Sequence, residues 1–277
     1  MTGVIDVGGG LRGIYGAGVL DWCLDNGISF DMCIGVSAGA ANLSSFMAGQ
    51  KGRNRAFYME YAFRKKYMGM RNIPGGGYIN LNYIYGTLSN SGGEYPLNFQ
   101  AMRSSGKKYI AVATNAITGR PKYFDMRDMH QDRYEPIKAS SCVPVVNKPY
   151  VIGRVPYFDG GMSDPIPVNR AFREGCDKVV IILTRPKDQY RNARTDTRLA
   201  SVLTRKYPRS AYKLTHRAEL YNRQLDLAKR YEARGKVLIL SPADISGMRT
   251  LKKDRAAMEL MYREGYEDAA RIADFIR

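Results

Sequence analysis

The chain has 277 residues, 44% of them hydrophobic, and a formal net charge of +17. This length is enough to bury a sizeable core, and no apolar run approaches the roughly 18 residues that are needed to cross a bilayer. The N-terminus has no basic region followed by an apolar leader, so we expect a cytoplasmic protein. The four cysteines form no CxxC pair, which favours buried free thiols over a disulfide or metal framework.

The positive charge is concentrated in two segments. Residues 51–71 hold seven Lys and Arg against one acid, and residues 185–234 hold fourteen against five. Such segments are typical of proteins that bind an anionic membrane surface or a nucleic acid, and also of a basic face that only aids solubility. Composition alone leaves these alternatives open.

The first elements alternate between short apolar runs and helical patterns. Residues 3–7 predict a buried strand, and a glycine-rich turn at 8–13 follows it. Apolar residues at helical spacing predict a helix over 14–25, and a second apolar run, 32–34, leads into another helix over 38–47. Two strands that are each followed by a helix indicate an α/β fold with parallel strands.

The remaining expected elements are shorter strands and two charged helical regions. The strands are expected at 108–113, 150–152, 155–158, 178–183 and 236–240, and the helical regions at 209–234 and 250–276. The two strands around Gly153-Arg154 predict a hairpin. No stretch has the composition of an interdomain linker. We therefore expect one domain, with a core over residues 1–185 and a basic, mainly helical C-terminal extension over 186–277 packed on it.

The pentapeptide Gly35-Val36-Ser37-Ala38-Gly39 lies between the second strand and its helix. A serine on such a tight turn has the geometry of a nucleophile elbow, in which Oγ projects from the sheet. The flanking Gly35 and Gly39 let neighbouring backbone pass close by. The pattern G-x-S-x-G is common by chance, and its position between a strand and a helix is what favours a catalytic serine.

The glycine-rich turn, Gly8-Gly9-Gly10-Leu11-Arg12-Gly13, also matches G-x-G-x-x-G. In either function that this allows, N–H groups at a helix N-terminus bind negative charge. The charge is a pyrophosphate in a dinucleotide site and the developing oxyanion in an acyl hydrolase. A dinucleotide site also needs an acidic residue at the end of the second strand, but Asp31 precedes that strand and Ser37 follows it. This placement favours an oxyanion hole.

A serine nucleophile needs a base, and the chain has only two histidines. His130 lies in a polar stretch and His216 in a basic helix, and neither has a motif around it. A third motif, Asp159-Gly160-Gly161, follows the 155–158 strand. Alone, such an aspartate is most often a turn cap. The scarcity of histidine nevertheless points to a Ser–Asp dyad.

Together the three motifs stand in the order, and at about the spacing, of the patatin-like phospholipase family, which the chain resembles over about residues 3–185. The segments 138–144 and 164–168 are similar to those that this family carries around its Asp-Gly-Gly. One departure is Val7, where many members have aspartate, and we expect little consequence from it. The resemblance implies a three-layer α/β/α fold with a central, mostly parallel sheet.

By the same resemblance, Ser37 attacks an ester carbonyl and Asp159 accepts its proton. An aspartate is normally a weak base, so burial and a hydrogen bond to the serine Oγ would be needed to make it effective. An acyl-enzyme then forms and is hydrolysed by water. The implied oxyanion hole is the turn of Gly8, Gly9, Gly10, Leu11, Arg12 and Gly13, with Gly9, Gly10 and Leu11 as the expected N–H donors.

The implied substrate is a phospholipid, a lysophospholipid or another fatty acyl ester, and no metal or cofactor is required. The basic charge fits an anionic membrane surface, which implies a cytoplasmic protein that is peripheral at the inner membrane face. Arg12 is expected to add positive charge near the site, to bind a lipid phosphate, or to be a surface charge. Residues 56–68 interleave aromatic and cationic side chains, as an interfacial helix or lid does and as an ordinary packed helix also does.

Three other functions stay open. A carboxylesterase or a thioesterase would use the same dyad and cannot be separated from a phospholipase by sequence. A nucleotide-binding protein would use the glycine turn but would leave Ser37 and Asp159 unexplained. A basic scaffold for membrane or nucleic acid would explain the charge and none of the motifs, so we do not expect a nucleic-acid partner.

Overall fold

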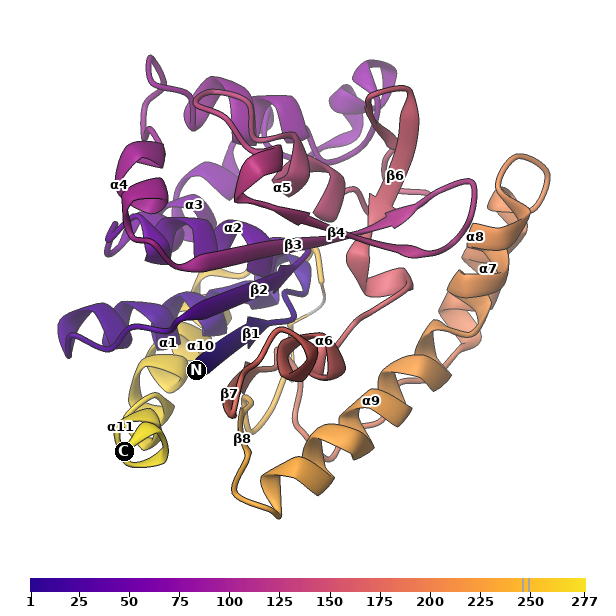
Figure 1. The fold of residues 1–277 in the computed structure, drawn as a ribbon. Helices are drawn as coiled ribbons and strands as arrows, with labels where there is room; N and C mark the ends of the chain where they lie inside the picture. Colours follow the sequence, from indigo (N-terminus) through magenta and orange to yellow (C-terminus); the bar gives the residue numbers. More distant parts are fainter. Residues whose placement is uncertain (246, 249) are drawn as a thin grey trace.

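The computed structural model describes residues 1–245, 247–248 and 250–277. Within them an eight-stranded sheet has the order β5-β6-β3-β2-β1-β7-β8, with β4 paired to β3 outside this path (Figure 1). The strands are β1 Thr2–Asp6, β2 Met32–Val36, β3 Lys108–Asn115, β4 Pro121–Asp125, β5 Tyr150–Ile152, β6 Val155–Asp159, β7 Lys178–Ile182 and β8 Val237–Leu240.

The strands from β3 through β2, β1 and β7 to β8 are parallel. The other three, β4, β5 and β6, join antiparallel at the β3 end of the sheet. The expected α/β fold with a mostly parallel central sheet is therefore confirmed, and the expected hairpin is β5 and β6.

Helices flank the sheet and form most of the C-terminal region. The α-helices are α1 Ile14–Asp25, α2 Ala38–Met47, α3 Arg53–Met59, α4 Phe99–Ser104, α5 Glu135–Ser140, α6 Val168–Arg173, α7 Arg194–Leu203, α8 Pro208–Thr215, α9 Arg217–Glu232, α10 Arg255–Asp268 and α11 Arg271–Ile276. Short 3₁₀ segments span Gly10–Gly13, Tyr61–Phe63, Met70–Gly75, Met126–Asp128 and Gly160–Met162, and a π-helix spans Tyr83–Leu88. Among the described residues, no helix is long and apolar enough to cross a membrane.

Neighbouring residues of the central strands face opposite layers. Val4 and Cys33 belong to the core under α1, α2 and α10, whereas Ile5 and Ile34 pack against α6 and α9. Side chains alternate in this way along every strand, and a parallel sheet that is covered on both faces needs apolar residues on both. This is why the strands were visible in the sequence as continuous apolar runs, and it confirms the three-layer arrangement.

The C-terminal region contributes to the sheet as well as to the helical layers. Strand β8 pairs with β7 and extends the parallel part of the sheet. Helix α10 packs along α1 (Figure 1). A Cβ at Gly18 would collide with the backbone of Tyr262, and one at Gly265 would collide with the backbone of Tyr15, so a glycine on each helix permits the close contact. Whether residue 185 separates two folding units stays a prediction.

Candidate active site

Ser37 lies between β2 and α2 with a backbone φ of 57° and ψ of −130°. A positive φ is uncommon for a residue with a side chain, and such strain is typical of functional positions. The Ser37 N–H donates a hydrogen bond to the Oγ of Ser140 at 2.9 Å, which helps to hold the turn. A Cβ at Gly35 would collide with Ala40, and one at Gly39 would collide with the backbone of Asp6. Both glycines are therefore required by the tight packing of the elbow.

Strand β3 brings Ser37 and Asp159 together, although they are far apart in the sequence. One edge of β3 pairs with β4, and the other edge pairs first with β2 and then with β6. Strand β2 ends with Val36 opposite Val112, and the antiparallel β6 ends with Asp159 opposite Ala113, the next residue of β3. The serine and the aspartate therefore follow strand ends at neighbouring positions of one edge.

The Asp159 residue is buried, with 6% exposed, and it lines the same cavity as Ser37. Its carboxyl group accepts a hydrogen bond from the N–H of Gly161 at 2.7 Å. Burial raises the pKa of Asp159, while the nearby Ser37 side chain, the Gly161 N–H and the charges of Arg217 and Arg191 oppose the rise. A Cβ at Gly160 would collide with the backbone of β3, so both glycines of this motif have a defined structural task.

The glycine turn after β1 has three consecutive residues with positive φ, 63° at Gly8, 138° at Gly9 and 60° at Gly10. Among the described residues, the N–H groups of Gly9 and Gly10 have no hydrogen-bond acceptor. The Leu11 N–H instead donates to the carbonyl oxygen of Thr250 at 2.8 Å. This corrects the expectation that Leu11 is an oxyanion donor, since its N–H is already paired.

Asp6 supports this turn, and no sequence motif pointed to it. Its carboxyl group accepts hydrogen bonds from the Gly8 N–H at 2.9 Å and from the Asn42 amide at 2.8 Å. Asn42 on α2 also donates to the Gly13 carbonyl and accepts from the Tyr58 hydroxyl, so it joins the turn to α2 and α3. Burial raises the pKa of Asp6 to about 6.

Arg12 is buried rather than a surface charge, with 6% exposed. Its Nε donates to the Thr184 carbonyl at 3.0 Å, and its Nη1 donates to the Thr250 hydroxyl at 3.2 Å. Burial first, and then the nearby charge of Arg185, lowers the pKa of Arg12 to about 10. The Thr184 hydroxyl also donates to the Gly8 carbonyl at 2.5 Å. Thr184 therefore holds both the Arg12 side chain and the glycine turn in place.

Two cavities meet at Ser37. The first, which we call the apolar cavity, has a volume of about 70 Å³ and is lined mainly by Phe57, Tyr67, Met68, Leu81 and Ile84. The second, the arginine cavity, has a volume of about 260 Å³ and also reaches Asp159, Gly9 and Gly10. Its charged lining consists of Asp159, Asp196, Arg12, Arg185, Arg191 and Arg217. Only Asp159 and Arg12 of these were singled out by sequence.

The stretch 56–68 lies partly in the wall of the apolar cavity. Its aromatic residues Phe57, Tyr61 and Tyr67 are buried, while Lys65 and Lys66 are exposed. The aromatic rings therefore belong to the packed interior, as in the ordinary interpretation of this pattern. The exposed lysines leave a cationic surface beside the cavity.

Neither histidine reaches the candidate dyad. His130 forms an isolated β-bridge with Arg133, and the His216 ring lies on the Tyr212 ring and contacts its carbonyl oxygen at 2.9 Å. Neither is among the described residues that line the two cavities. In residues 1–245, 247–248 and 250–277, no group of three or more His, Cys, Asp or Glu is placed to hold a metal ion.

Asp31 is also misplaced for a dinucleotide site. It precedes β2 and accepts hydrogen bonds from Thr2, at the start of β1. Because β1 and β2 are parallel, Asp31 and the glycine turn lie at opposite ends of the sheet. The ribose ligand that a dinucleotide site would need is therefore missing from the position that the sequence suggested.

Comparison with known proteins places two parts of this chain in described families. A model of the patatin-like phospholipase family matches residues 7–172, and a model of a domain of unknown function, DUF6363, matches residues 207–276. YjjU of Escherichia coli strain K12, described as uncharacterized, is 34% identical over 189 residues, which cover 66% of this chain and 52% of YjjU. The chain thus spans about half the length of this curated relative.

Among solved structures, VipD from Legionella pneumophila is similar in fold. The comparison covers 99% of this chain and 66% of VipD, with a TM-score of 0.50 at 12% sequence identity. This likeness concerns the fold alone. The match to the family model, by contrast, covers more than half of the chain and includes the glycine turn, the elbow and Asp159. The chain therefore belongs to the patatin-like phospholipase family.

Proposed function

We propose that this protein is a serine lipid acyl hydrolase that cleaves fatty acyl esters with Ser37 and Asp159. The observation that carries the proposal is that Ser37 and the buried Asp159 follow neighbouring strand ends along β3 and line the same cavity. Membership of the patatin-like phospholipase family supports lipid acyl hydrolysis in general. The assignment of the dyad and of the substrate is our own inference.

In the proposed reaction, Ser37 Oγ attacks the ester carbonyl carbon while Asp159 takes the hydroxyl proton. Burial favours this transfer because it raises the pKa of Asp159 and so makes the carboxylate a stronger base. The N–H groups of Gly9 and Gly10 face the oxyanion, and one such donor stabilises the transition state by about 3 kcal/mol.

The first intermediate then collapses. Its carbon–oxygen bond to the alcohol breaks, and Asp159 returns the proton to the leaving alcohol, which leaves an acyl group on Ser37. Water attacks this acyl-enzyme, with Asp159 again accepting the proton, and the fatty acid departs as the Ser37 hydroxyl is restored. The steps need no metal and no cofactor.

The apolar cavity is the proposed site of the acyl chain, because its walls are aromatic and aliphatic. Its volume of about 70 Å³ also favours a second candidate, a carboxylesterase that acts on short acyl chains with the same dyad. A series of esters with increasing chain length would separate the two functions.

A lipid substrate implies contact with a membrane, which we propose for the segment between Met68 and Ile79. Met70 and Ile73 are 73% and 45% exposed. Lys65, Lys66 and Arg71 are exposed beside them. Apolar side chains flanked by cations suit the surface of an anionic bilayer, so we propose a peripheral protein at the cytoplasmic face of the membrane.

Labelling with a fluorophosphonate tests the nucleophile directly. We expect wild-type protein to form an adduct on Ser37, and Ser37→Ala to form none and to lose at least about 10³-fold in kcat/KM. Asp159→Asn should label very weakly, because the asparagine amide cannot accept the Ser37 proton. The measurement is gel fluorescence with peptide mapping of the adduct, alongside hydrolysis of p-nitrophenyl esters.

His130→Ala and His216→Ala are the matched controls, since neither side chain lines the cavities. Both should label and turn over as the wild type does. Full labelling of Ser37→Ala would contradict the nucleophile assignment. Loss of activity in a folded histidine variant would contradict the dyad and require a triad.

A further inference from the structure

The arginine cavity, which lies beside the proposed nucleophile, has a strongly charged lining. Four guanidinium groups line it, from Arg12, Arg185, Arg191 and Arg217. Two carboxylates face them, those of Asp159 and Asp196. With all six groups ionised, the lining therefore has an excess of two positive charges.

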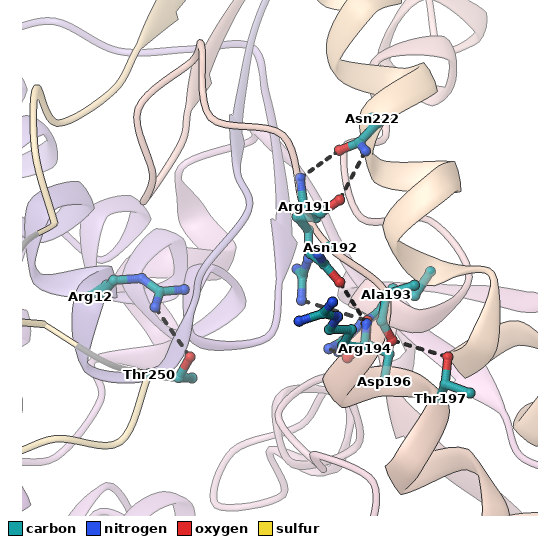
Figure 2. Close-up of polar contacts among 10 residues, drawn as sticks. Arg12, Arg191, Asn192, Ala193, Arg194, Asp196, Thr197, Asn222 and Thr250 are labelled. Carbon is teal, nitrogen blue, oxygen red and sulfur yellow. Dashed lines mark hydrogen bonds and ion pairs between the residues drawn. The ribbon is translucent and has the colours of Figure 1, made fainter.

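The arginines are held in place by the fold. Arg191 is fixed through its backbone, whose N–H donates to the Asn222 side chain at 2.8 Å and whose carbonyl accepts from it at 3.1 Å (Figure 2). Its guanidinium lies 5.3 Å from the centre of the Tyr221 ring. In Figure 2 the Arg12 guanidinium, held by Thr250, points toward the group that contains Arg191 and Asp196.

The two carboxylates leave half of the arginine charge unmatched. Arg217 binds both oxygens of Asp196, whereas Arg191 approaches the same carboxylate only to 4.0 Å. Among the described residues, the buried Nε of Arg185 has no hydrogen-bond partner. A buried polar group without a partner costs free energy, so an anion in the cavity would stabilise it.

Repulsion between the arginines is evident in their acid–base properties. Burial first, and then the charges of Arg217 and Arg185, lower the pKa of Arg191 to about 9, while Asp196 opposes the change. Arg12 is affected by Arg185 in the same direction. Arg12 and Arg191 are thus close enough to other arginines of the cavity to be affected by their charge.

We propose that the arginine cavity binds a phosphate monoester on the alcohol portion of the substrate, so that the enzyme cleaves acyl esters of a phosphorylated polyol. This inference rests on the proposed function, which puts the acyl chain in the apolar cavity and the leaving alcohol on the other side of Ser37. A phosphate monoester carries about −1.5 to −2 charges at pH 7, which matches the excess of two.

The geometry also favours a monoester over other phospholipid head groups. Guanidinium groups bind phosphate oxygens through paired N–H donors, and a monoester presents three terminal oxygens to them. A head group with an ammonium would bring a cation against the arginines, while Asp196 is already bound by Arg217. Arg217 and Tyr221 lie in the segment that the DUF6363 model matches, so under this proposal that segment takes part in choosing the substrate.

Binding without turnover is the first test. In the Ser37→Ala background, calorimetry should detect glycerol 3-phosphate and not glycerol. Arg191→Gln should weaken the binding about 10-fold to 100-fold, because charge-assisted hydrogen bonds are lost while Arg217 still pairs with Asp196. Arg198→Gln is the matched control, since Arg198 lies on α7 but is exposed and does not line the cavity.

Turnover is the second test, with the ratio of kcat/KM for 1-acylglycerol 3-phosphate to that for 1-acylglycerol. We expect a ratio of at least about ten in the wild type and in Arg198→Gln, and a ratio near one in Arg191→Gln. A butyryl pair in solution and an oleoyl pair in detergent micelles distinguish the two sources of the phosphate. A preference confined to the micellar pair identifies a lipid head group, and one confined to the soluble pair identifies a free phosphate ester.

The outcomes separate this inference from the proposed function. Absence of glycerol 3-phosphate binding, or binding that Arg191→Gln and Arg198→Gln weaken equally, overturns the phosphate site. Arg191-dependent binding in a protein that hydrolyses no ester supports the phosphate site and overturns the hydrolase. Thermal unfolding of each variant shows whether the protein is still folded.

Discussion

The two cavities beside Ser37 differ in size, in chemistry and in origin. The apolar cavity has about 70 Å³ and takes most of its wall from residues before 90. The arginine cavity has about 260 Å³ and takes three of its four arginines from residues 185–217. The patatin model matches residues 7–172 and thus covers the first wall but not these arginines. The difference teaches that the part matched by the family model builds the cavity proposed for the acyl chain, and that the C-terminal region supplies most of the arginines of the other cavity.

The largest effect is expected from a substitution that fills the apolar cavity. Ala41 lies on α2 and lines that cavity. In Ala41→Phe the new ring should occupy the space for the acyl chain, so kcat/KM for a decanoyl ester should fall about 100-fold. The acetyl ester needs less of the cavity and should lose little. Hydrolysis of a p-nitrophenyl ester series gives the ratio, and an equal loss for both esters would contradict the assignment of the acyl side.

A second test asks whether the protein contacts a membrane through the segment between Met68 and Ile79, which adjoins the apolar cavity. The double change Met70→Ser and Ile73→Ser should weaken binding to anionic vesicles about tenfold, because two exposed apolar side chains are removed from the proposed surface. Cosedimentation with vesicles measures the affinity. The control is Val202→Ser, another exposed apolar residue, on α7. If both variants bind equally, the surface is elsewhere.

The smallest effect is expected from the charge of Arg191, which lies in the arginine cavity and acts on the pKa of the proposed base, Asp159. Activity on a neutral ester should decline as the pH falls through the raised pKa of Asp159, because the base must be ionised. Arg191 opposes that rise, so Arg191→Gln should move the acid limb of kcat/KM to higher pH. The expected loss on that limb is about two- to fivefold.

The pH profile of Arg198→Gln should follow the wild type, since Arg198 is exposed. A displacement of the limb to lower pH in Arg191→Gln would have the wrong sign and would show that the arginine does not act on Asp159 as a charge. An unchanged limb would mean that the two cavities are electrostatically independent.

Local patterns in the sequence were enough to locate every strand of the sheet except β4. The apolar runs before the glycine turn and before Ser37 correspond to β1 and β2. They were recognisable because the strands of a parallel sheet that is covered on both faces need apolar residues on both. The glycines of the elbow were visible because close backbone contact excludes a side chain. The sequence also suggested Asp159, although its position opposite Ala113 depends on strand pairing.

The remaining parts of the site depend on contacts between distant segments. Ser140 was a small residue in a recognised segment, and only the fold places its hydroxyl on the Ser37 N–H. Leu11 was expected to be free, but the Thr250 carbonyl occupies its N–H. Arg191 and Arg217 were two among many cations of a basic region. Charge counting found that region, but it could not show which arginines turn toward a cavity.

The contact between α1 and α10 has a consequence for the order of folding. Gly18 and Gly265 allow these helices to touch, although α1 is made early in synthesis and α10 late. Until α10 has left the ribosome, the face of α1 that it covers lacks its partner, and contacts of such long sequence separation form slowly. Strands β1 and β2, which lead into the glycine turn and the elbow, can pair early in synthesis. The core beneath them is complete only after α10, which follows the last strand, has been made. An unfinished chain would therefore expose this face of α1 to chaperones or to other nascent chains.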